Sequence, residues 1–432
     1  MRFALAPRLA AAATAVMTVA TSALCLTGTA SAATTVSTRS FGIHQLNPAH
    51  PLLVQFGASR IWDMGVTWKK LQPRKGHTSP SALARLDSIV ASQRAHGSQP
   101  LITLGMTPAW AAHKCNHYSG GVNWGLQTCA PVKIGAYGAW GSYVRMLAKR
   151  YRGKVSYFEL WNEPSLRNGY NDSVRTLAKM QATAQSILHH YGEKLVSPAI
   201  PFTDGSPNNG LNWLNSFLRL PGGKAFDIVG LHLYPSDAAA RAGYGPEWSM
   251  QALGWARSVL RRNNVANKPV WDTETNVGRI PAHTAQGGGS RGAAMVARTF
   301  VLATQHGVSR TFWYAADDRR WGGTWLESKT AKSLTTAGHA YATVQNLLVG
   351  ARPRGCTQTS VGSNKWHVAC RYRLANGKGM VAVWSTSGAF TYHGPKSTHQ
   401  VVGVAGGSRT VSHSTALRIG AAPQYVIGTF NV

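Results

Sequence analysis

Short apolar runs alternate with longer amphipathic stretches over most of the first 350 residues. The apolar runs predict eight β-strands, at residues 41–44, 56–63, 100–105, 155–161, 194–198, 226–235, 268–274 and 310–314. Helical periodicity is found at residues 81–96, 134–151, 174–191, 250–262, 293–306 and 337–348. Strands that alternate with helices predict a parallel sheet, and eight of them favour a closed (β/α)8 TIM barrel. An open doubly wound sheet would normally carry a glycine-rich phosphate loop after its first strand, and this chain has none there.

The pattern changes at residue 350. Short alternating runs at 366–370, 380–384 and 424–427 are separated by Gly, Ser and Asn. This pattern is typical of an all-β domain of the sandwich type. We therefore expect a catalytic barrel over residues 33–349 and a C-terminal β-sandwich accessory domain over residues 350–432.

The first 32 residues have the pattern of a signal peptide. Arg2 and Arg8 precede a run rich in Ala, Val and Met, and Ala30-Ser31-Ala32 forms a small-residue cleavage site. A membrane anchor is the alternative, but the cleavage site argues against it. No later segment approaches the roughly 20 apolar residues that a spanning helix needs. We therefore expect a secreted, soluble protein without a membrane anchor after cleavage.

Four cysteines remain once Cys25 leaves with the signal peptide. They are Cys115, Cys129, Cys356 and Cys370. In an oxidising compartment they predict two local disulfides, Cys115–Cys129 and Cys356–Cys370, because each pair is close in sequence. Each closed loop of about 15 residues contributes around 3 kcal/mol in the chain-entropy model. His113 and His117 flank Cys115 and raise a metal site as an alternative, but zinc usually binds closely spaced cysteine pairs. We expect no metal and no cofactor.

The charge of the chain is strongly positive. Lys and Arg number 45 against 15 Asp and Glu, which gives a net charge of +30, and residues 328–432 contain no acidic residue. Such a surface favours an anionic partner, for example an acidic polysaccharide or a cell wall. The alternative is general solubility with a neutral glycan as substrate. Nucleic acid is not expected, because secretion argues against it and no nucleic-acid motif is present.

Two of the predicted strands end in a carboxylate. The strand at 155–161 is followed by Asn162, Glu163 and Pro164, and the strand at 268–274 ends in Glu274. Barrel enzymes place their chemistry at the carboxyl ends of the strands. Hydrolysis of a glycosidic bond needs two facing carboxyl groups, one to protonate the leaving oxygen and one to attack or to activate water. A single acidic residue in such a place can also be a buried ion pair, which we expect for Glu159 with an arginine.

These residues resemble the clan-A glycoside hydrolases, which are retaining (β/α)8 enzymes. The resemblance rests on Asn162-Glu163-Pro164, Glu274, Arg60-Ile61-Trp62-Asp63, Gly65-Val66-Thr67-Trp68, Thr107-Pro108-Ala109-Trp110, His232-Leu233-Tyr234-Pro235 and Trp313. Within the clan, the chain is most similar to glycoside hydrolase family 39 and to related bacterial exopolysaccharide hydrolases that carry a C-terminal β-sandwich.

The resemblance implies a role for each site residue. Glu163 would be the acid/base and Glu274 the nucleophile. Asn162 would hold the sugar 2-hydroxyl. Arg60 and Tyr234 would orient Glu274 and favour its charged form, whereas Glu163 must stay protonated near the working pH.

Three further residues are candidates for binding substrate. His232 would line the same subsite, although a hydrogen-bonded histidine at a barrel mouth is an equally ordinary interpretation. Trp110 and Trp313 would stack on sugar rings, although a single tryptophan is more often a core residue. The prediction is a secreted retaining glycosidase that cleaves a polysaccharide by double displacement. The alternatives are a transglycosidase that uses the same residues and a non-catalytic carbohydrate- or wall-binding protein on this barrel.

Overall fold

The structure is a computed structural model. It describes residues 34–45, 52–115, 125–166, 168–202, 207–317, 320–330, 332–413 and 415–432. The predicted signal peptide and His117 lie outside these residues. Ala33–Val432 form one compact unit. Across the described segments, no helix is long and apolar enough to cross a membrane.

A parallel sheet of nine labelled strands forms the first part of the chain, in the order β5-β4-β3-β2-β1-β9-β8-β7-β6. The strands are β1 (Phe41–His44), β2 (Ala58–Ile61), β3 (Gln99–Leu104), β4 (Tyr157–Leu160), β5 (Lys194–Val196), β6 (Ile200–Pro201), β7 (Val229–His232), β8 (Val270–Thr275) and β9 (Val308–Tyr314). β5 and β6 are two halves of one barrel strand. Bridges from Val196 to Ile228 and from Asn162 to Ala199 join the two edges of the sheet. The predicted (β/α)8 barrel is therefore confirmed.

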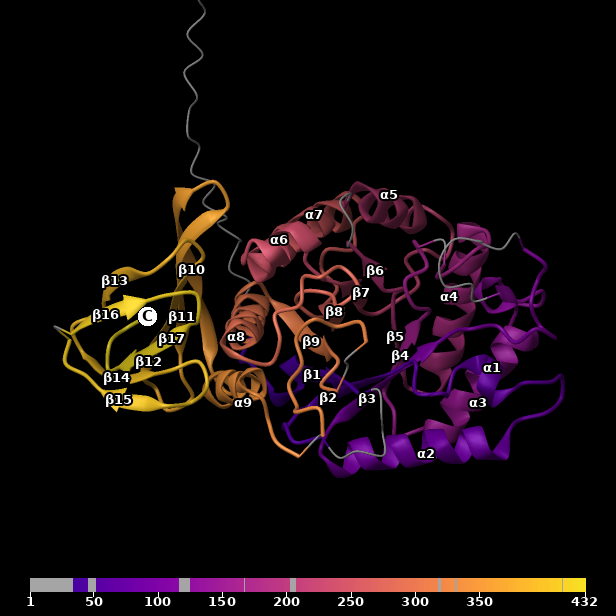
Figure 1. Ribbon diagram of the computed structural model, residues 1–432. Helices are drawn as coiled ribbons and strands as arrows, with labels where there is room; N and C mark the ends of the chain where they lie inside the picture. The colour runs from indigo at the N-terminus through magenta and orange to yellow at the C-terminus, as the bar shows by residue number, and fades with distance from the viewer. Residues whose placement is uncertain are drawn as a thin grey trace, which may run out of the picture. The chain divides into compact units, whose positions relative to one another are not determined.

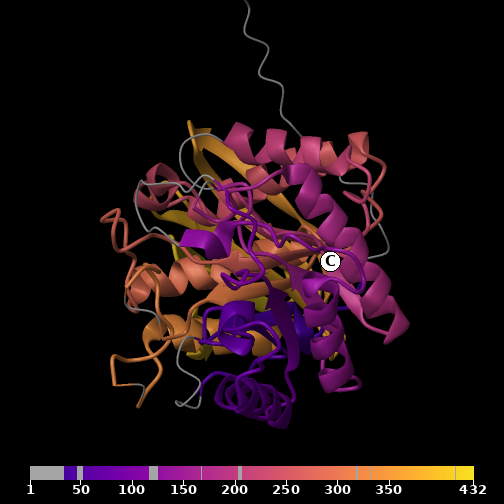
Figure 2. The ribbon, with the colours of Figure 1, turned by 90° about the vertical axis from the view of Figure 1, so that its right-hand side faces the viewer.

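The helices lie outside the curled sheet (Figures 1 and 2). They are α1 (Trp68–Leu71), α2 (Pro80–Ala95), α3 (Ala139–Tyr151), α4 (Val174–His190), α5 (Pro207–Leu218), α6 (Asp237–Arg241), α7 (Gly245–Arg262), α8 (Ser290–Gln305) and α9 (Thr336–Leu348), with 3-10 turns η1 (Thr38–Ser40) and η2 (Gly125–Thr128). All six helices expected from the sequence are present. α2 begins as its sequence predicts, because Ser79 accepts the N–H of Ala82 and Pro80 occupies the first turn.

The interior of the barrel is filled by strand side chains. Ala58, Leu101, Val196, Ile228, Trp271 and Phe312 form a cluster to which no helix contributes. Trp271 lies beneath the guanidinium of Arg310, 4.0 Å from the ring centre. This packing closes the barrel below its mouth, so the chemistry has to occur at the carboxyl ends of the strands.

The C-terminal part is an all-β sandwich. Its strands are β10 (Arg352–Gly362), β11 (Lys365–Arg373), β12 (Gly379–Ser385), β13 (Phe390–His393), β14 (Thr398–Val402), β15 (Ser408–Thr410), β16 (Ala416–Ile419) and β17 (Gln424–Gly428). A six-stranded sheet, β10-β11-β12-β17-β14-β15, packs against the two-stranded sheet β13-β16. Val381 and Val383 of β12 contact Leu417 and Ile419 of β16 in the layer between them.

The other face of the six-stranded sheet packs on the barrel helices. Tyr372 donates to the carbonyl oxygen of Val301 in α8 at 2.8 Å. The indole N–H of Trp384 donates to Glu247 of α7 at 2.8 Å, and Glu247 also pairs with buried Arg298. One hydrophobic cluster contains residues of both parts. The predicted division at residue 350 falls between α9 and β10, and its status as a boundary between independent domains stays a prediction.

Both predicted disulfides are confirmed. Cys115 and Cys129 join two ends of the long segment after β3. Cys356 and Cys370 are directly opposite each other on β10 and β11 and are bonded across the pair of strands.

Candidate active site

Four barrel strands deliver the candidate residues to one place. β2 carries Arg60, β7 ends in His232, β8 carries Glu274, and Glu163 follows β4 by three residues. The predicted residues Asn162 and Tyr234 lie in the same cluster. The structure therefore brings together six of the eight side chains proposed from the sequence.

Arg60 is the centre of this cluster and is completely buried. Its guanidinium donates to Glu159 at 2.8 Å, to Glu274 at 2.6 Å and to the side-chain oxygen of Asn162 at 2.7 Å. Burial alone would lower the pKa of Arg60, but the carboxylates of Glu159 and Glu274 raise it above its usual range. Arg60 is therefore permanently charged, and the ion pair expected for Glu159 is present.

Both oxygens of Glu274 accept hydrogen bonds. Oε2 receives the Arg60 guanidinium, and Oε1 receives the hydroxyl of Tyr234 at 2.8 Å. Burial, followed by the charge of Glu274, raises the pKa of Tyr234 well above its usual value, so the phenol keeps its proton. The two donors fix the carboxylate of Glu274 in one orientation.

Glu163 has an unusual backbone conformation. Its φ is +47° and that of Trp161 is +60°, in the left-handed region that non-glycine residues rarely adopt. The turn is tight, because a Cβ placed on Gly169 would lie 2.2 Å from the carbonyl oxygen of Glu163. Left-handed non-glycine residues cluster at functional sites. The turn leaves the Glu163 side chain 22% exposed at the mouth of the barrel.

His232 lies between the two glutamates. Its Nδ1 is 2.9 Å from Oε1 of Glu163, and its Nε2 is 3.9 Å from Oε2 of Glu274. Burial is the main cause that lowers the pKa of His232 to about 4, and the charge of Arg60 acts in the same direction. The imidazole is therefore neutral at ordinary pH and orients Glu163 through one hydrogen bond.

The two glutamates are close together. One carboxylate oxygen of Glu163, one of Glu274 and a ring nitrogen of His232 all lie within 4.8 Å of one another. Two carboxylates and a histidine could also bind a divalent metal ion. The Arg60 guanidinium, 2.6 Å from Glu274, argues against a cation here, because it already supplies the positive charge.

A second cluster at the barrel mouth was not assigned from the sequence. His44 at the end of β1 lies 2.5 Å from Oδ1 of Asp63, and Tyr314 at the end of β9 donates to Oδ2 at 2.9 Å. Burial raises the pKa of Asp63, but the interactions with His44 and Tyr314 outweigh burial and lower this pKa to about 2. The Asp63 side chain is 35% exposed. The ring of Trp321 contacts both Tyr314 and Tyr234, which connects this cluster to Glu274.

The two predicted stacking tryptophans lie in different environments. Trp110 is half-buried, and its indole N–H donates to the carbonyl oxygen of Gln72 at 2.8 Å, so its stacking role stays a prediction. Trp313 is fully buried against Phe300, and its N–H points to the carbonyl oxygen of Thr324. The expected stacking role does not fit the position of Trp313, because no part of its ring reaches the surface.

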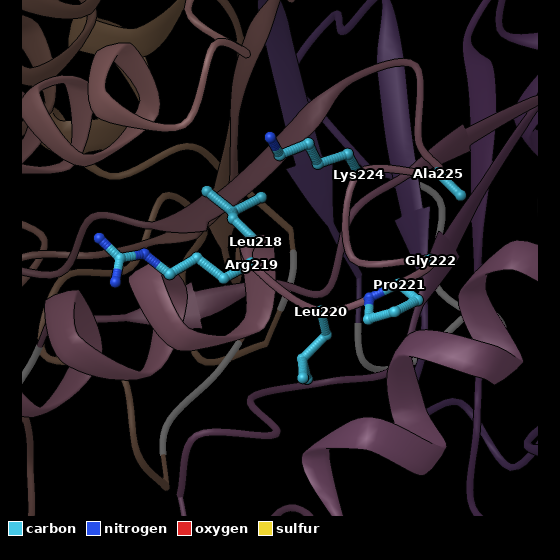
Figure 3. Close-up of a pocket in the computed structure, with 7 residues that line it drawn as sticks. All are labelled: Leu218, Arg219, Leu220, Pro221, Gly222, Lys224 and Ala225. Carbon is cyan, nitrogen blue, oxygen red and sulfur yellow. The ribbon is translucent and has the colours of Figure 1, made fainter.

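A surface hollow follows α5 and is separate from this cluster. Figure 3 shows the residues that line it, which are Leu218, Arg219, Leu220, Pro221, Gly222, Lys224 and Ala225. None of them belongs to the carboxylate cluster, and none carries a carboxyl group, so this hollow is not the candidate active site.

Comparisons with known proteins agree with this arrangement. Residues 137–341 match the family model of the glycosyl hydrolase catalytic core. A family 39 glycoside hydrolase from the gut symbiont Bacteroides cellulosilyticus WH2 has a TM-score of 0.63 at 17% identity, covering 91% of this chain and 82% of that one. No curated protein matches the chain.

Two further solved structures have the same fold. The family 39 enzyme from Xanthomonas axonopodis pv. citri gives a TM-score of 0.58 at 13% identity, covering 92% of this chain and 96% of that one. The family 30 subfamily 8 xylanase from Clostridium acetobutylicum gives 0.59 at 13% identity, covering 92% and 97%. Both matches cover more of this chain than the barrel alone makes up, so the β-sandwich is part of the structural similarity.

The matched catalytic core contains both Glu163 and Glu274. Residues 137–341 therefore form a glycosyl hydrolase catalytic core, and the chain shares its fold with the family 39 and family 30 glycoside hydrolases.

Proposed function

We propose that the protein is a secreted retaining glycoside hydrolase that cleaves a polysaccharide. The observation that carries this proposal is the separation of the two glutamates, whose nearest oxygens lie within 4.8 Å. Retaining enzymes hold their carboxyl groups about 5–5.5 Å apart, whereas inverting enzymes leave about 6.5–9.5 Å for a water molecule. The short separation supports direct attack by one glutamate.

Glu274 is the nucleophile in this mechanism, and Glu163 is the acid/base. In the first step an oxygen of Glu274 attacks the anomeric carbon, while Glu163 gives its proton to the glycosidic oxygen and the alcohol leaves. The product is a glycosyl ester on Glu274. In the second step Glu163 removes a proton from water, which attacks the same carbon and releases Glu274 as a carboxylate.

The surroundings of the two glutamates support this division of roles. Arg60 and Tyr234 donate to the two oxygens of Glu274 and fix its orientation, as a nucleophile requires. Glu163 instead faces a neutral imidazole and is partly open to solvent, where a leaving group and then water can reach it. The environments differ, as the two roles require.

Two more side chains supply sugar contacts. The oxygen of Asn162 accepts from Arg60, so its amide N–H groups remain as donors toward a sugar hydroxyl. Asp63 presents a partly exposed carboxylate that accepts hydrogen bonds from sugar hydroxyls. A fixed negative charge at this position favours a neutral sugar at the cleavage point.

Secretion and the anionic polymer belong to the same proposal. The two disulfides and the leader-like sequence of residues 1–32 support an oxidising compartment. The net charge of +30 supports a polyanionic glycan as the bound polymer.

The test combines a glycan panel with product analysis. The wild-type protein is assayed on neutral and acidic polysaccharides, and the anomer released first is followed by proton NMR. We expect the anomer of the substrate, and a fluorosugar inactivator should label Glu274. Release of the opposite anomer would overturn the double displacement. Transfer of the sugar to an added alcohol in preference to water would favour the transglycosidase.

A further inference from the structure

A hollow beside the start of β10 and the turn that joins β11 to β12 is lined by three arginines. Arg352 begins β10, Arg354 follows it, and Arg373 ends β11. Thr35, Gly350 and the 374–377 turn complete the lining. None of the three guanidiniums has a hydrogen-bond or ion-pair partner among the residues that the structure describes.

The arrangement of these arginines destabilises the protein when no anion is bound. Arg352 and Arg373 are directly opposite each other in the antiparallel pair β10–β11, and like charges in that position destabilise a sheet. No Asp or Glu occurs anywhere in residues 328–432 to offset them. A cluster of like charges that the protein does not neutralise is complementary to an anion from outside.

The fold holds this hollow in place through segments that are distant in sequence. Val36 pairs with the linker between the barrel and the β-sandwich, donating to the carbonyl oxygen of Ala351 at 2.9 Å and accepting from Gly350 at 2.8 Å. Gly350 adopts a φ of +84°, and a Cβ there would lie 2.8 Å from that of Ala375. The start of β10 is therefore fixed against both the N-terminal segment and the 374–377 turn.

We propose that this hollow is a binding site for the oxyanion group of an acidic glycan, a carboxylate or a phosphate. Arginine presents a planar fork of donors that matches both groups, and neither needs a metal ion or a proton transfer to bind. The site contains none of the residues of the carboxylate cluster at the barrel mouth. It retains the polymer and takes no part in bond cleavage, so it can be tested by binding alone, whether or not the proposed hydrolysis is correct.

The experiment measures retention of the full chain on four immobilised glycans. Polygalacturonate and phosphorylated dextran provide carboxylate and phosphate. Fully methyl-esterified polygalacturonate and plain dextran are their neutral counterparts. The double variant Arg352→Ala/Arg373→Ala is compared with Arg409→Ala/Arg418→Ala, which removes the same charge from exposed positions on β15 and β16.

We expect the hollow variant to bind at least one anionic glycan about tenfold more weakly than the wild type, since one charged contact is worth about that factor. The control variant should lose about twofold or less through general charge. The anionic polymer that shows the difference identifies the group. Equal loss in both variants, or no loss in either, would overturn the site.

A conservative variant separates the effect of the forked guanidinium donors from the effect of the positive charge. Arg352→Lys/Arg373→Lys keeps the charge and should still bind several-fold more weakly, because a lysine cannot form paired hydrogen bonds to one oxyanion. Binding equal to the wild type would contradict the assignment. Circular dichroism of each variant checks folding. If the double alanine variant is unfolded, Arg354→Ala and the lysine variant decide the question.

Discussion

The guanidinium of Arg60 lies 2.6 Å from the carboxylate of Glu274, and Arg60 is completely buried while Glu274 is nearly so. The same guanidinium lies 2.7 Å from fully buried Glu159. One cation therefore serves two carboxylates in the interior of the barrel mouth. Such an arrangement holds the proposed nucleophile in place, and it makes the fold dependent on a residue of the candidate active site.

Loss of Arg60 should destabilise the protein strongly. Arg60→Gln leaves the two carboxylates buried without their cation, and breaking a buried pair costs about 3–5 kcal/mol of unfolding free energy. Urea denaturation measures this loss. The control is Arg150→Gln, which removes the exposed pair with Asp87 and should cost about 1 kcal/mol or less. A similar, small loss in both variants would contradict the shared role of Arg60.

The two glutamates should respond differently to the leaving group. Glu163→Ala should slow substrates with poor leaving groups by about 10²–10⁴-fold, because only these need the proton, and should affect activated aryl glycosides less. Glu274→Ala should abolish turnover of both. Steady-state kinetics on a matched pair of substrates measures the difference. If both variants lose the two substrates equally, the proposed roles are unsupported.

Asp63 should act on substrate binding through its charge. Its pKa of about 2 means that it is ionised throughout an assay range from pH 4 to 9. Asp63→Asn keeps the shape and removes the charge. We expect kcat/KM to fall about tenfold, mainly through KM, since a charged hydrogen bond contributes about 1.5–3 kcal/mol. The ratio of variant to wild type should be constant with pH. A ratio that changes between pH 5 and 8 would show that another group titrates here.

Glu193 predicts a pH dependence of stability that is independent of catalysis. It is 3% exposed after α4, and burial raises its pKa to about 8. In the unfolded chain a glutamate loses its proton near its usual value of about 4.3. Between these values the native state holds a proton that the unfolded state lacks. The unfolding free energy therefore falls as pH rises, by up to about 1.4 kcal/mol per pH unit.

Glu193→Gln should remove this dependence. Glutamine resembles the neutral acid, so the variant should melt near the wild-type temperature at pH 4 and above it at pH 8. Thermal unfolding across this range is the measurement. Asp227→Asn is the control variant, because Asp227, unlike Glu193, forms an ion pair with His189. Parallel curves for Glu193→Gln and the wild type would show that Glu193 does not keep its proton.

Local signals in the sequence were sufficient to predict much of the fold and to select the two glutamates as candidates. Glu163 and Glu274 could be found because each ends an apolar strand of a barrel, where side chains converge. α5 was missed because Pro207–Leu218 contains four asparagines and a glycine, which are poor helix formers. Burial of Leu214, Phe217 and Leu218 overrides that local preference.

Long-range packing explains what the sequence could not provide. Trp313 has a side chain of the kind that stacks on sugar rings. In the structure, however, contacts with α8 and with the segment after β9 cover its ring. His44, Asp63 and Tyr314 come from strands β1, β2 and β9 or their ends. They meet because β1 lies between the other two strands in the barrel, a neighbour relation between the first and last strands that no local pattern contains.

The face of β11, β12 and β17 that covers α7 and α8 has a consequence for how this protein can be divided. A gene cut at residue 350 would leave one product with Val301 and Glu247 uncovered and the other with Trp384, Tyr372 and Ile427 in water. Apolar faces of this kind promote aggregation when they are exposed. The β-sandwich is thus better understood as an integral part of the folded enzyme than as an interchangeable module. Swapping it between enzymes would require the paired surfaces of α7 and α8 to be transferred with it.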